Sequence, residues 1–241
     1  VEHLTHTYSA GTPFQRSAVE DVSIDVMPGE FLGIIGHTGS GKSTVAKLLL
    51  CFHDATKGAI RLGGVDLREL SQDQIRSRIA YVPQKAWLFS GTVASNLRFG
   101  NEDATEADML HALEVAQSTF VLEQPQGLDT PVAQGGTNFS GGQRQRLAIA
   151  RALMKRADLY IFDDSFSALD FKTDAALRHA LQDETCDAAV LIIAQRISTI
   201  LHADQIVVLK DGEVVGLGTH GELMETCEVY RAIAESQMKG G

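Results

Sequence analysis

The residues with the clearest chemical pattern form a glycine-rich loop after a short apolar run. Phe31 to Ile35 are typical of a buried strand, and the next eight positions fit Gly-x-x-x-x-Gly-Lys-Ser. In such a loop, backbone N–H groups and a helix N-terminus surround phosphates. Lys42 adds a full charge, and the Ser43 hydroxyl is suited to hold Mg²⁺. The residues expected to contact nucleotide here are Gly36, Thr38, Gly39, Ser40, Gly41, Lys42, Ser43 and Thr44.

The alternative interpretation of this loop is a flexible Gly/Ser segment that happens to precede a lysine. A helical pattern follows at 44–52, with Val45, Leu48, Leu49 and Phe52 on one face. A strand before the loop and a helix after it are the context that phosphate binding requires, so the sequence favours a nucleotide site.

Two adjacent aspartates supply the candidate metal and catalytic groups. Residues 159–162 have strand character, and Asp163 and Asp164 follow directly. A carboxylate at the tip of a buried strand is where a phosphate-loop enzyme holds Mg²⁺, so Asp163 is the expected ligand. Asp164 is placed to position or activate water. The alternative is that both aspartates only cap a following helix, and the phosphate loop favours the catalytic interpretation.

Composition restricts the class of protein. The chain has 241 residues, of which 44% are hydrophobic, enough for one α/β domain with a large core. The net charge of −10 disfavours binding to nucleic acid. No apolar run approaches the roughly 20 residues of a membrane helix, and the first 20 residues lack a secretion signal. These features predict a cytosolic chain with no direct membrane span. Any attachment to a membrane is then expected to come from partners.

The three cysteines are widely spaced and form no C-x-x-C pair. A disulfide framework or a zinc site is therefore not indicated. We expect all three to be buried and reduced. They are Cys51, Cys186 and Cys227.

Strands and helices are expected to alternate around the motifs. Strands are predicted at 1–8, 22–26, 31–35, 79–82, 159–162 and 188–194, and hairpins at 58–67 and 205–218. The hairpins turn at Gly63-Gly64 and Asp211-Gly212. Helices are predicted at 71–78 and 171–184, and a last helix begins at a capping box of Thr219 and Glu222.

Between residues 87 and 156 the periodicity is helical, which predicts a helical subdomain inserted into the α/β core. Thr105 is placed to cap one helix, and a second follows Ser140-Gly141-Gly142. The second helix has basic residues that are expected to form a solvated face beyond its first turn. They are Arg144, Arg146, Arg151, Lys155 and Arg156.

With these motifs in this order, the chain resembles the nucleotide-binding domain of ABC transporters. Residues 139–143, Phe-Ser-Gly-Gly-Gln, are similar to the family signature Leu-Ser-Gly-Gly-Gln, and residues 167–170 match the loop at the family's dimer interface. Gln84 matches the glutamine that touches Mg²⁺ or water and senses the membrane partner. Tyr8 matches the aromatic residue that stacks on adenine, although a tyrosine in a strand could equally serve packing. The signature residues that contact nucleotide in this family correspond to Ser140, Gly141, Gly142 and Gln143.

The resemblance covers nearly the whole chain and implies a fold and partners. The implied fold is a single α/β domain with a phosphate-loop NTPase (RecA-like) core, an antiparallel β subdomain and an inserted helical subdomain. The core and β subdomain would occupy about 1–85 and 157–241, and the helical subdomain about 86–156. ATP and Mg²⁺ are the implied cofactors. A second nucleotide-binding domain, in a head-to-tail dimer, and transmembrane domains at the inner face of the cell membrane are the implied partners.

Two departures from the family pattern concern hydrolysis. Asp164 stands where the family usually has glutamate, and Gln195 stands at the switch histidine. A base displaced by about 1 Å can cost about 10²-fold in rate, and loss of a preorganised contact costs about 10²- to 10³-fold. Lys42, Gln84, Asp164 and Gln195 are the implied catalytic set. Two hypotheses stay open: a slow ATPase that drives transport, and an ATP clamp that completes a partner's hydrolytic site.

Different segments resemble different branches of the family. Residues 87–97 are similar to multidrug and lipid exporters, whose membrane helices precede this domain, so the sequence resembles an excised domain or a separate subunit. Residues 8–14 and 36–39 look more like the ATPase subunits of vitamin and cobalt uptake transporters. This contrast raises the hypothesis of a chimeric chain joined near residue 44.

Overall fold

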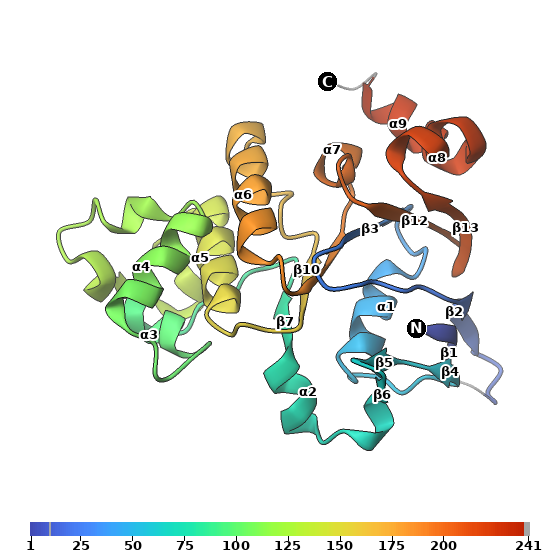
Figure 1. Ribbon diagram of the computed structural model, residues 1–241, viewed down its shortest axis with the longest axis horizontal. Helices are drawn as coiled ribbons and strands as arrows, with labels where there is room; N and C mark the ends of the chain where they lie inside the picture. Colours follow the sequence, from blue (N-terminus) through green and yellow to red (C-terminus); the bar gives the residue numbers. More distant parts are fainter. Residues whose placement is uncertain (10, 239–241) are drawn as a thin grey trace.

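A six-stranded sheet forms the centre of the molecule in the computed structural model, which describes residues 1–9 and 11–238 (Figure 1). In spatial order its strands are β13 (Glu213–Gly218), β12 (Gln205–Lys210), β3 (Phe31–Gly36), β11 (Ala189–Ile193), β10 (Leu159–Asp163) and β7 (Ile79–Val82). All neighbours are parallel except β12 and β13, which form the predicted hairpin. Parallel strands share one carboxyl edge, so the residues that follow β3, β7, β10 and β11 meet there.

Alternate residues of the buried strands pack into two apolar layers, one on each face of the sheet. In β3, Leu32 and Ile34 face the layer that contains helix α1 (Lys42–Leu49) and helix α2 (Gln72–Arg78). Phe31 and Ile35 face the opposite layer, which contains α6 (Phe171–Glu184) and the other helices described below. Because both faces are covered, the strands read as continuous apolar runs rather than alternating ones.

A smaller antiparallel sheet lies beside α1, with β1 (Glu2–Tyr8) between β2 (Arg16–Val22) and β4 (Lys57–Ala59). The strand predicted at 22–26 is therefore wrong in position. Ile24 is buried and exchanges two backbone hydrogen bonds with Val1, but no regular ladder continues there. The alternating apolar pattern thus indicated a buried Ile24, but this segment is not a regular strand. Ala10, which falls in the 8–14 stretch, lies outside the described residues.

The hairpin of β5 (Arg61–Leu62) and β6 (Val65–Asp66) turns at Gly63-Gly64 as predicted, with φ of 59° and 82°. A 3₁₀ turn at Leu67–Glu69 follows it. Phe52 lies beyond the end of α1 and is exposed, so its predicted place on the buried helix face is wrong.

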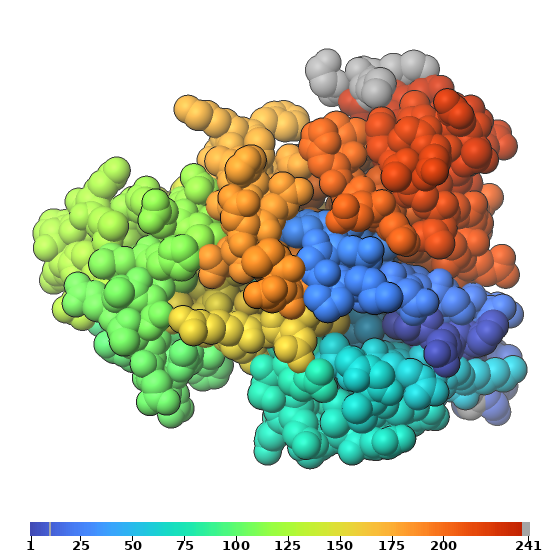
Figure 2. Space-filling model, in the orientation of Figure 1, coloured from blue at the N-terminus to red at the C-terminus, as the bar shows by residue number. Residues whose placement is uncertain are grey.

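Helices α3 (Val93–Arg98), α4 (Glu106–Val115) and α5 (Gly141–Leu153) lie together at one end of the molecule, and α6 stands between them and the C-terminal part (Figures 1 and 2). Thr105 caps α4 and Ser140 caps α5, each through a capping box. Short 3₁₀ turns at 119–121, 127–129 and 134–136 and the strand pair β8 (Gly91–Thr92) and β9 (Pro131–Val132) complete this end.

The basic residues of α5 and of the turn after it form the predicted solvated face only in part, because Arg156 is exposed whereas the others are not. Arg146, Arg151 and Lys155 are half-buried, and their side chains donate to the carbonyls of Gln117, Trp87 and Ile79. Burial lowers the pKa of all three groups. Their long aliphatic side chains place the charged groups against the backbone of neighbouring segments. The periodicity of one helix cannot predict such contacts.

The predicted last helix is two helices, α8 (His220–Thr226) and α9 (Glu228–Met238), because Cys227 adopts extended backbone angles between them. Short helix α7 (Ile197–Ile200) follows β11. The cysteines are free, but only Cys227 is buried, and Cys186 is exposed, contrary to expectation. No helix within residues 1–9 and 11–238 has the length and apolar character needed to cross a membrane.

Truncation of Phe162 should lower the free energy of unfolding strongly. Phe162 on β10 is 0% exposed, whereas Phe14 is 86% exposed. Phe162→Ala should cost about 3–5 kcal/mol because it leaves a cavity in the core. Phe14→Ala, the matched control, should stay within about 0.5 kcal/mol. Urea unfolding followed by circular dichroism measures both, and equal losses would contradict the assigned core.

Candidate functional site

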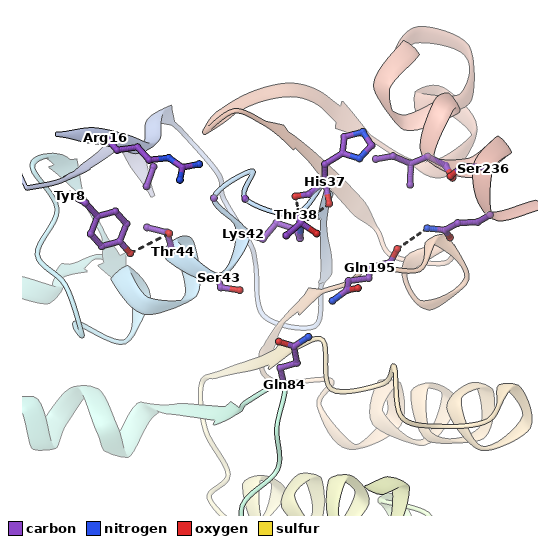
Figure 3. A pocket seen from close by; sticks show the side chains of 16 residues that line it. Tyr8, Arg16, His37, Thr38, Lys42, Ser43, Thr44, Gln84, Gln195 and Ser236 are labelled. Atoms are coloured by element: carbon purple, nitrogen blue, oxygen red, sulfur yellow. Dashed lines mark hydrogen bonds between the residues drawn. The ribbon is translucent and has the colours of Figure 1, made fainter. Parts of the chain in front are cut away.

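The loop between β3 and α1 lines a cavity of about 560 Å³ (Figure 3). Gly36 and Gly41 shape this loop. A Cβ on Gly36 would lie 2.1 Å from the Leu209 carbonyl oxygen, and one on Gly41, at φ 103°, would lie 2.4 Å from the Ala18 carbonyl oxygen. Only glycine fits at these two positions. The expected residues that line the cavity are Tyr8, Gly36, Thr38, Gly39, Gly41, Lys42, Ser43, Thr44, Gln84 and Gln195.

The Lys42 ammonium group lies folded over the loop. It donates to the carbonyls of Gly36 at 2.6 Å and His37 at 2.9 Å. Burial lowers the pKa of Lys42, and the carboxylates of Asp164 and Asp163 oppose that shift. Ser40 is buried and its hydroxyl faces this ammonium at 3.5 Å, so it does not line the cavity. The lysine is therefore held by neutral acceptors, which a negatively charged phosphate could replace.

Asp163, at the end of β10, is a buried carboxylate beside the loop. Its Oδ1 accepts from the Ser43 hydroxyl at 3.4 Å and its Oδ2 from the Tyr81 hydroxyl at 3.2 Å. Burial raises its pKa, although both hydrogen bonds act in the other direction. Among the described side chains Asp163 forms no ion pair, and no cluster of three His, Cys, Asp or Glu is found.

These donors fit Mg²⁺, which prefers oxygen ligands and needs only one or two from the protein when phosphates supply the others. Asp163 and Ser43 would hold the ion. The raised pKa of the buried carboxyl, which marks a charge short of a counter-ion, supports this fit.

Asp164 lies one residue further and joins the ends of three strands. Its Oδ2 accepts from the Gln84 side-chain amide at 2.8 Å and from the Gln195 amide at 2.7 Å. Gln84 follows β7 and Gln195 follows β11. The backbone of Asp164 has a φ of 50°, held by a hydrogen bond from its N–H to the Ile193 carbonyl. This left-handed conformation is uncommon outside glycine, and aspartate tolerates it better than most residues.

Tyr8 lies on one side of the phosphate loop, and α9 lies on the other (Figure 3). The Tyr8 hydroxyl is 3.4 Å from the Thr44 hydroxyl. The imidazoles of His6 and His53 meet the tyrosine ring at interplanar angles of 89° and 88°. Neither imidazole stacks flat on Tyr8.

Other residues at this cavity were not anticipated from the sequence. They are Arg16, Ala18, His37, Ile233, Ser236 and Gln237. Arg16 stands in a polar segment at the start of β2, where its sequence neighbours gave no signal. The α9 residues showed only the apolar period of a packed helix, since nothing local reveals that its last turns reach the phosphate loop.

The signature residues lie outside this cavity. Ser140 caps α5, because its hydroxyl accepts from the Gln143 N–H and the Gln143 side chain bonds back to the Ser140 N–H. Gly142 lies close to the Ala168 carbonyl, whereas a Cβ on Gly141 would meet nothing within 4 Å. One chain therefore presents a nucleotide-sized cavity and, separately, an exposed helix N-terminus that can receive an anion.

Comparison with known proteins decides the family. The sequence profile described as ABC transporter matches residues 19–167. The chain belongs to the ABC transporter family. An uncharacterized ABC transporter ATP-binding protein of Mycobacterium tuberculosis is 47% identical over 91% of this chain and 38% of its own length. The ATP-dependent lipid A-core flippase of Photobacterium profundum is 41% identical over 98% of this chain and 40% of its own length.

Among solved structures, a bacterial Atm1-family ABC exporter with ATP bound matches this ABC domain with a TM-score of 0.92. Sequence identity is 32%, and the match covers 98% of this chain and 41% of that one. The fold is therefore that of ABC ATPases, as the sequence predicted. The chain spans about two fifths of the length of the relatives it matches.

Asp163→Asn should stabilise the metal-free ABC domain at neutral pH. The folded pKa of Asp163 is raised above the ordinary value of about 3.9. The folded chain thus keeps a proton that the unfolded chain releases, and stability is lost as pH rises through that window. In urea unfolding with a chelator, the advantage of Asp163→Asn should grow as pH rises above about 4, the ordinary pKa, and disappear below it.

Exposed Asp103 supplies the control for this titration. Asp103→Asn should leave the pH dependence of unfolding unchanged. An Asp163→Asn variant that is less stable than the parent at pH 7 would show that the carboxylate is already well compensated.

Proposed function

We propose that this chain binds ATP with Mg²⁺ and hydrolyses it as the motor domain of an ABC exporter. The observation that carries the proposal is the meeting of four strand ends at one edge of the sheet. There the phosphate loop, Gln84 and Gln195 line a single cavity. Asp163 and Asp164 lie behind this lining and accept hydrogen bonds from Ser43, Gln84 and Gln195.

Each end of the cavity suits one part of the nucleotide. Tyr8, which lines the cavity, suits stacking on adenine, and Arg16 is placed to add charge at the same side (Figure 3). The loop amides and Lys42 suit the phosphates. Asp163 and Ser43 would hold Mg²⁺, which would neutralise negative charge on the phosphates. Asp164 is then the group that accepts a proton from the attacking water, with Gln84 and Gln195 orienting its carboxylate.

The exposed signature supports a head-to-tail dimer as the working form. Ser140 to Gln143 do not reach the cavity of their own chain. In the proposed dimer they contact the γ-phosphate held by a second nucleotide-binding domain, through the Ser140 hydroxyl and the N-terminus of α5.

Transmembrane domains are the second proposed partner, and they would hold the chain at the cytoplasmic face of the membrane. The support is the similarity to exporters and flippases, of which this chain matches about two fifths. Gln84 is the proposed sensor of that partner. We further propose that about 86–156 move as a helical subdomain against about 1–85 and 157–241.

A second candidate function is an ATP clamp that completes a partner's hydrolytic site. The observation that favours it is the double donation by Gln84 and Gln195 to one Asp164 oxygen. An oxygen that already accepts two amide N–H groups is a poorer base, since water must displace one of them. In this form the chain holds ATP for long periods.

The chimeric origin stays a hypothesis carried by residues 8–14 and 36–39 alone. An exporter-type relative, the lipid A-core flippase, aligns over 98% of the chain, and this alignment gives the hypothesis no support. Scoring residues 1–44 and 45–241 separately against exporters and uptake transporters tests it. Equal scores of both segments against one exporter remove the hypothesis.

Mixing two inactive variants tests the composite site. Lys42→Ala disables a phosphate loop but keeps its signature. Gly141→Asp disables a signature, at a position where a Cβ would meet no atom within 4 Å. Each variant alone should lose turnover. An equal mixture should recover up to about a quarter of the wild-type rate, because about half the dimers are mixed and each has one intact site.

Gly221→Asp is the matched control, since Gly221 also has open space around it, and it should keep full turnover. A mixture of Lys42→Ala with the Lys42→Ala/Gly141→Asp double variant should stay inactive. Recovery there, or no recovery in the first mixture despite ATP-driven dimers, would contradict a site shared between two chains.

The pair Asp164→Glu and Gln195→His should raise turnover by at least about 10-fold if geometry limits hydrolysis. Nucleotide affinity should barely change, because the proposed binding contacts come from Lys42, the loop amides and Tyr8. Each single substitution should recover less than the pair. Steady-state ATPase assays and calorimetry measure the two quantities.

Two results would favour other interpretations. Unchanged turnover in the double variant, with normal ATP-driven dimerisation, means that another step limits the rate. A wild-type rate of about 1 s⁻¹ or more means that Asp164 is an adequate base.

A further inference from the structure

The side chain of Gln237, on the last described turn of α9, bonds to the segment that carries Gln195. Its Nε2 donates to the Gln195 carbonyl at 2.7 Å, and its Oε1 accepts from the Ile197 N–H at 2.9 Å. Figure 3 shows the first of these bonds as the dashed line that joins Gln195 to α9. One side-chain amide thus forms hydrogen bonds with two backbone groups, one on each side of Arg196.

The bond from the Ile197 N–H supplies a cap that the residues next to helix α7 do not provide. Helix α7 begins at Ile197, and its N-cap residue Arg196 makes no side-chain capping bond. The first N–H groups of a helix have no partner within it, and an N-cap side chain usually supplies one. Gln237 supplies it from 40 residues away. The Gln195 carbonyl and the Ile197 N–H, on either side of Arg196, both bond to the Gln237 side-chain amide. This amide therefore takes the place that a peptide group of a neighbouring strand would have.

The same segment continues into the reacting groups. The backbone of Gln195 is fixed by Gln237, and its side chain donates to Asp164 at 2.7 Å. We propose that Gln237 is a positioning residue, which couples α9 to the orientation of Gln195 and, through it, of Asp164. This inference rests on the proposed function, because it assigns Gln237 a part in the same hydrolytic site.

A purely structural role in holding α9 is the competing explanation. Tyr230, Ile233 and Ala234 on α9 are buried in the core, whereas the Gln237 side chain lies at the surface. Truncation of a surface amide should therefore leave α9 docked. The backbone conformation around Arg196 should loosen instead.

Nuclear magnetic resonance and kinetics on the full chain separate these explanations. Gln237→Ala removes both bonds, and the Ile197 amide should exchange about 10-fold faster with solvent. The side-chain amide signal of Gln195 should shift as its bond to Asp164 weakens. The turnover number should fall about 3- to 10-fold with KM nearly unchanged, as for a group that acts in the transition state.

Gln237→Glu should keep one of the two hydrogen bonds and remove the other. A carboxylate still accepts from the Ile197 N–H but repels the Gln195 carbonyl, so Ile197 should stay protected while turnover falls. Exposed Glu235 on the same helix gives the control Glu235→Ala, which should change none of these quantities. The melting temperature should differ little among the variants.

The resonance measurements keep this inference separate from the proposed function. An unchanged Gln195 side-chain signal in Gln237→Ala overturns the positioning role, whatever the turnover. A shifted signal together with a lower turnover number at unchanged KM supports the positioning role. A shifted signal in a chain that never hydrolyses ATP supports positioning and contradicts the ATPase proposal.

Discussion

Parallel pairing of β3 with β11 and β12, and of β10 with β11 and β7, is the constraint on which the site depends. In this register Asp163 pairs with Ile193 and Ile193 pairs with Ile34. The phosphate loop, the aspartates and Gln195 therefore emerge at one level of the sheet. A shift of one residue in any pair would turn the side chains of that strand to the opposite face and remove its contribution from the cavity.

The charges at this edge are arranged for a ligand rather than for the stability of the empty domain. Asp163 is buried without an ion-pair partner among the described residues, and its pKa is raised. Among the residues that the structure describes, Lys42 bonds to neutral groups of its own loop. Asp164 adopts a left-handed backbone conformation. Such costs persist where the surrounding fold enforces them, and they cluster at functional sites.

The contacts to Asp164 and Gln195 link distant parts of the chain. Gln84 reaches Asp164 across 80 residues, and Gln237 reaches Gln195 across 42. A displacement of α9 or of the segment after β7 therefore acts on the same carboxylate. Because both glutamine amides bond to one oxygen, a change in either contact alters the orientation and accessibility of the Asp164 carboxylate.

The sequence by itself determined the features that depend on near neighbours. The phosphate loop, the cap at Thr105, the capping box of Thr219 and Glu222, and the turn at Gly63-Gly64 each use residues a few positions apart, so their spacing carried the prediction. The place of Asp163 and Asp164 at the tip of an apolar strand marked them as candidate site residues. Similarity of motifs to a family supplied the fold class and the role of Gln195.

Only the tertiary structure decided which distant groups meet. Several features involve segments far apart in the chain. They are the true limits of β2, the carbonyl partners of the basic residues on and after α5, the shared oxygen of Asp164 and the hydrogen bonds of Gln237. Side-chain type says that such groups need partners, because buried polar groups must be satisfied. Which partner each one finds is fixed by how the sheet and helices pack, and no local pattern records that.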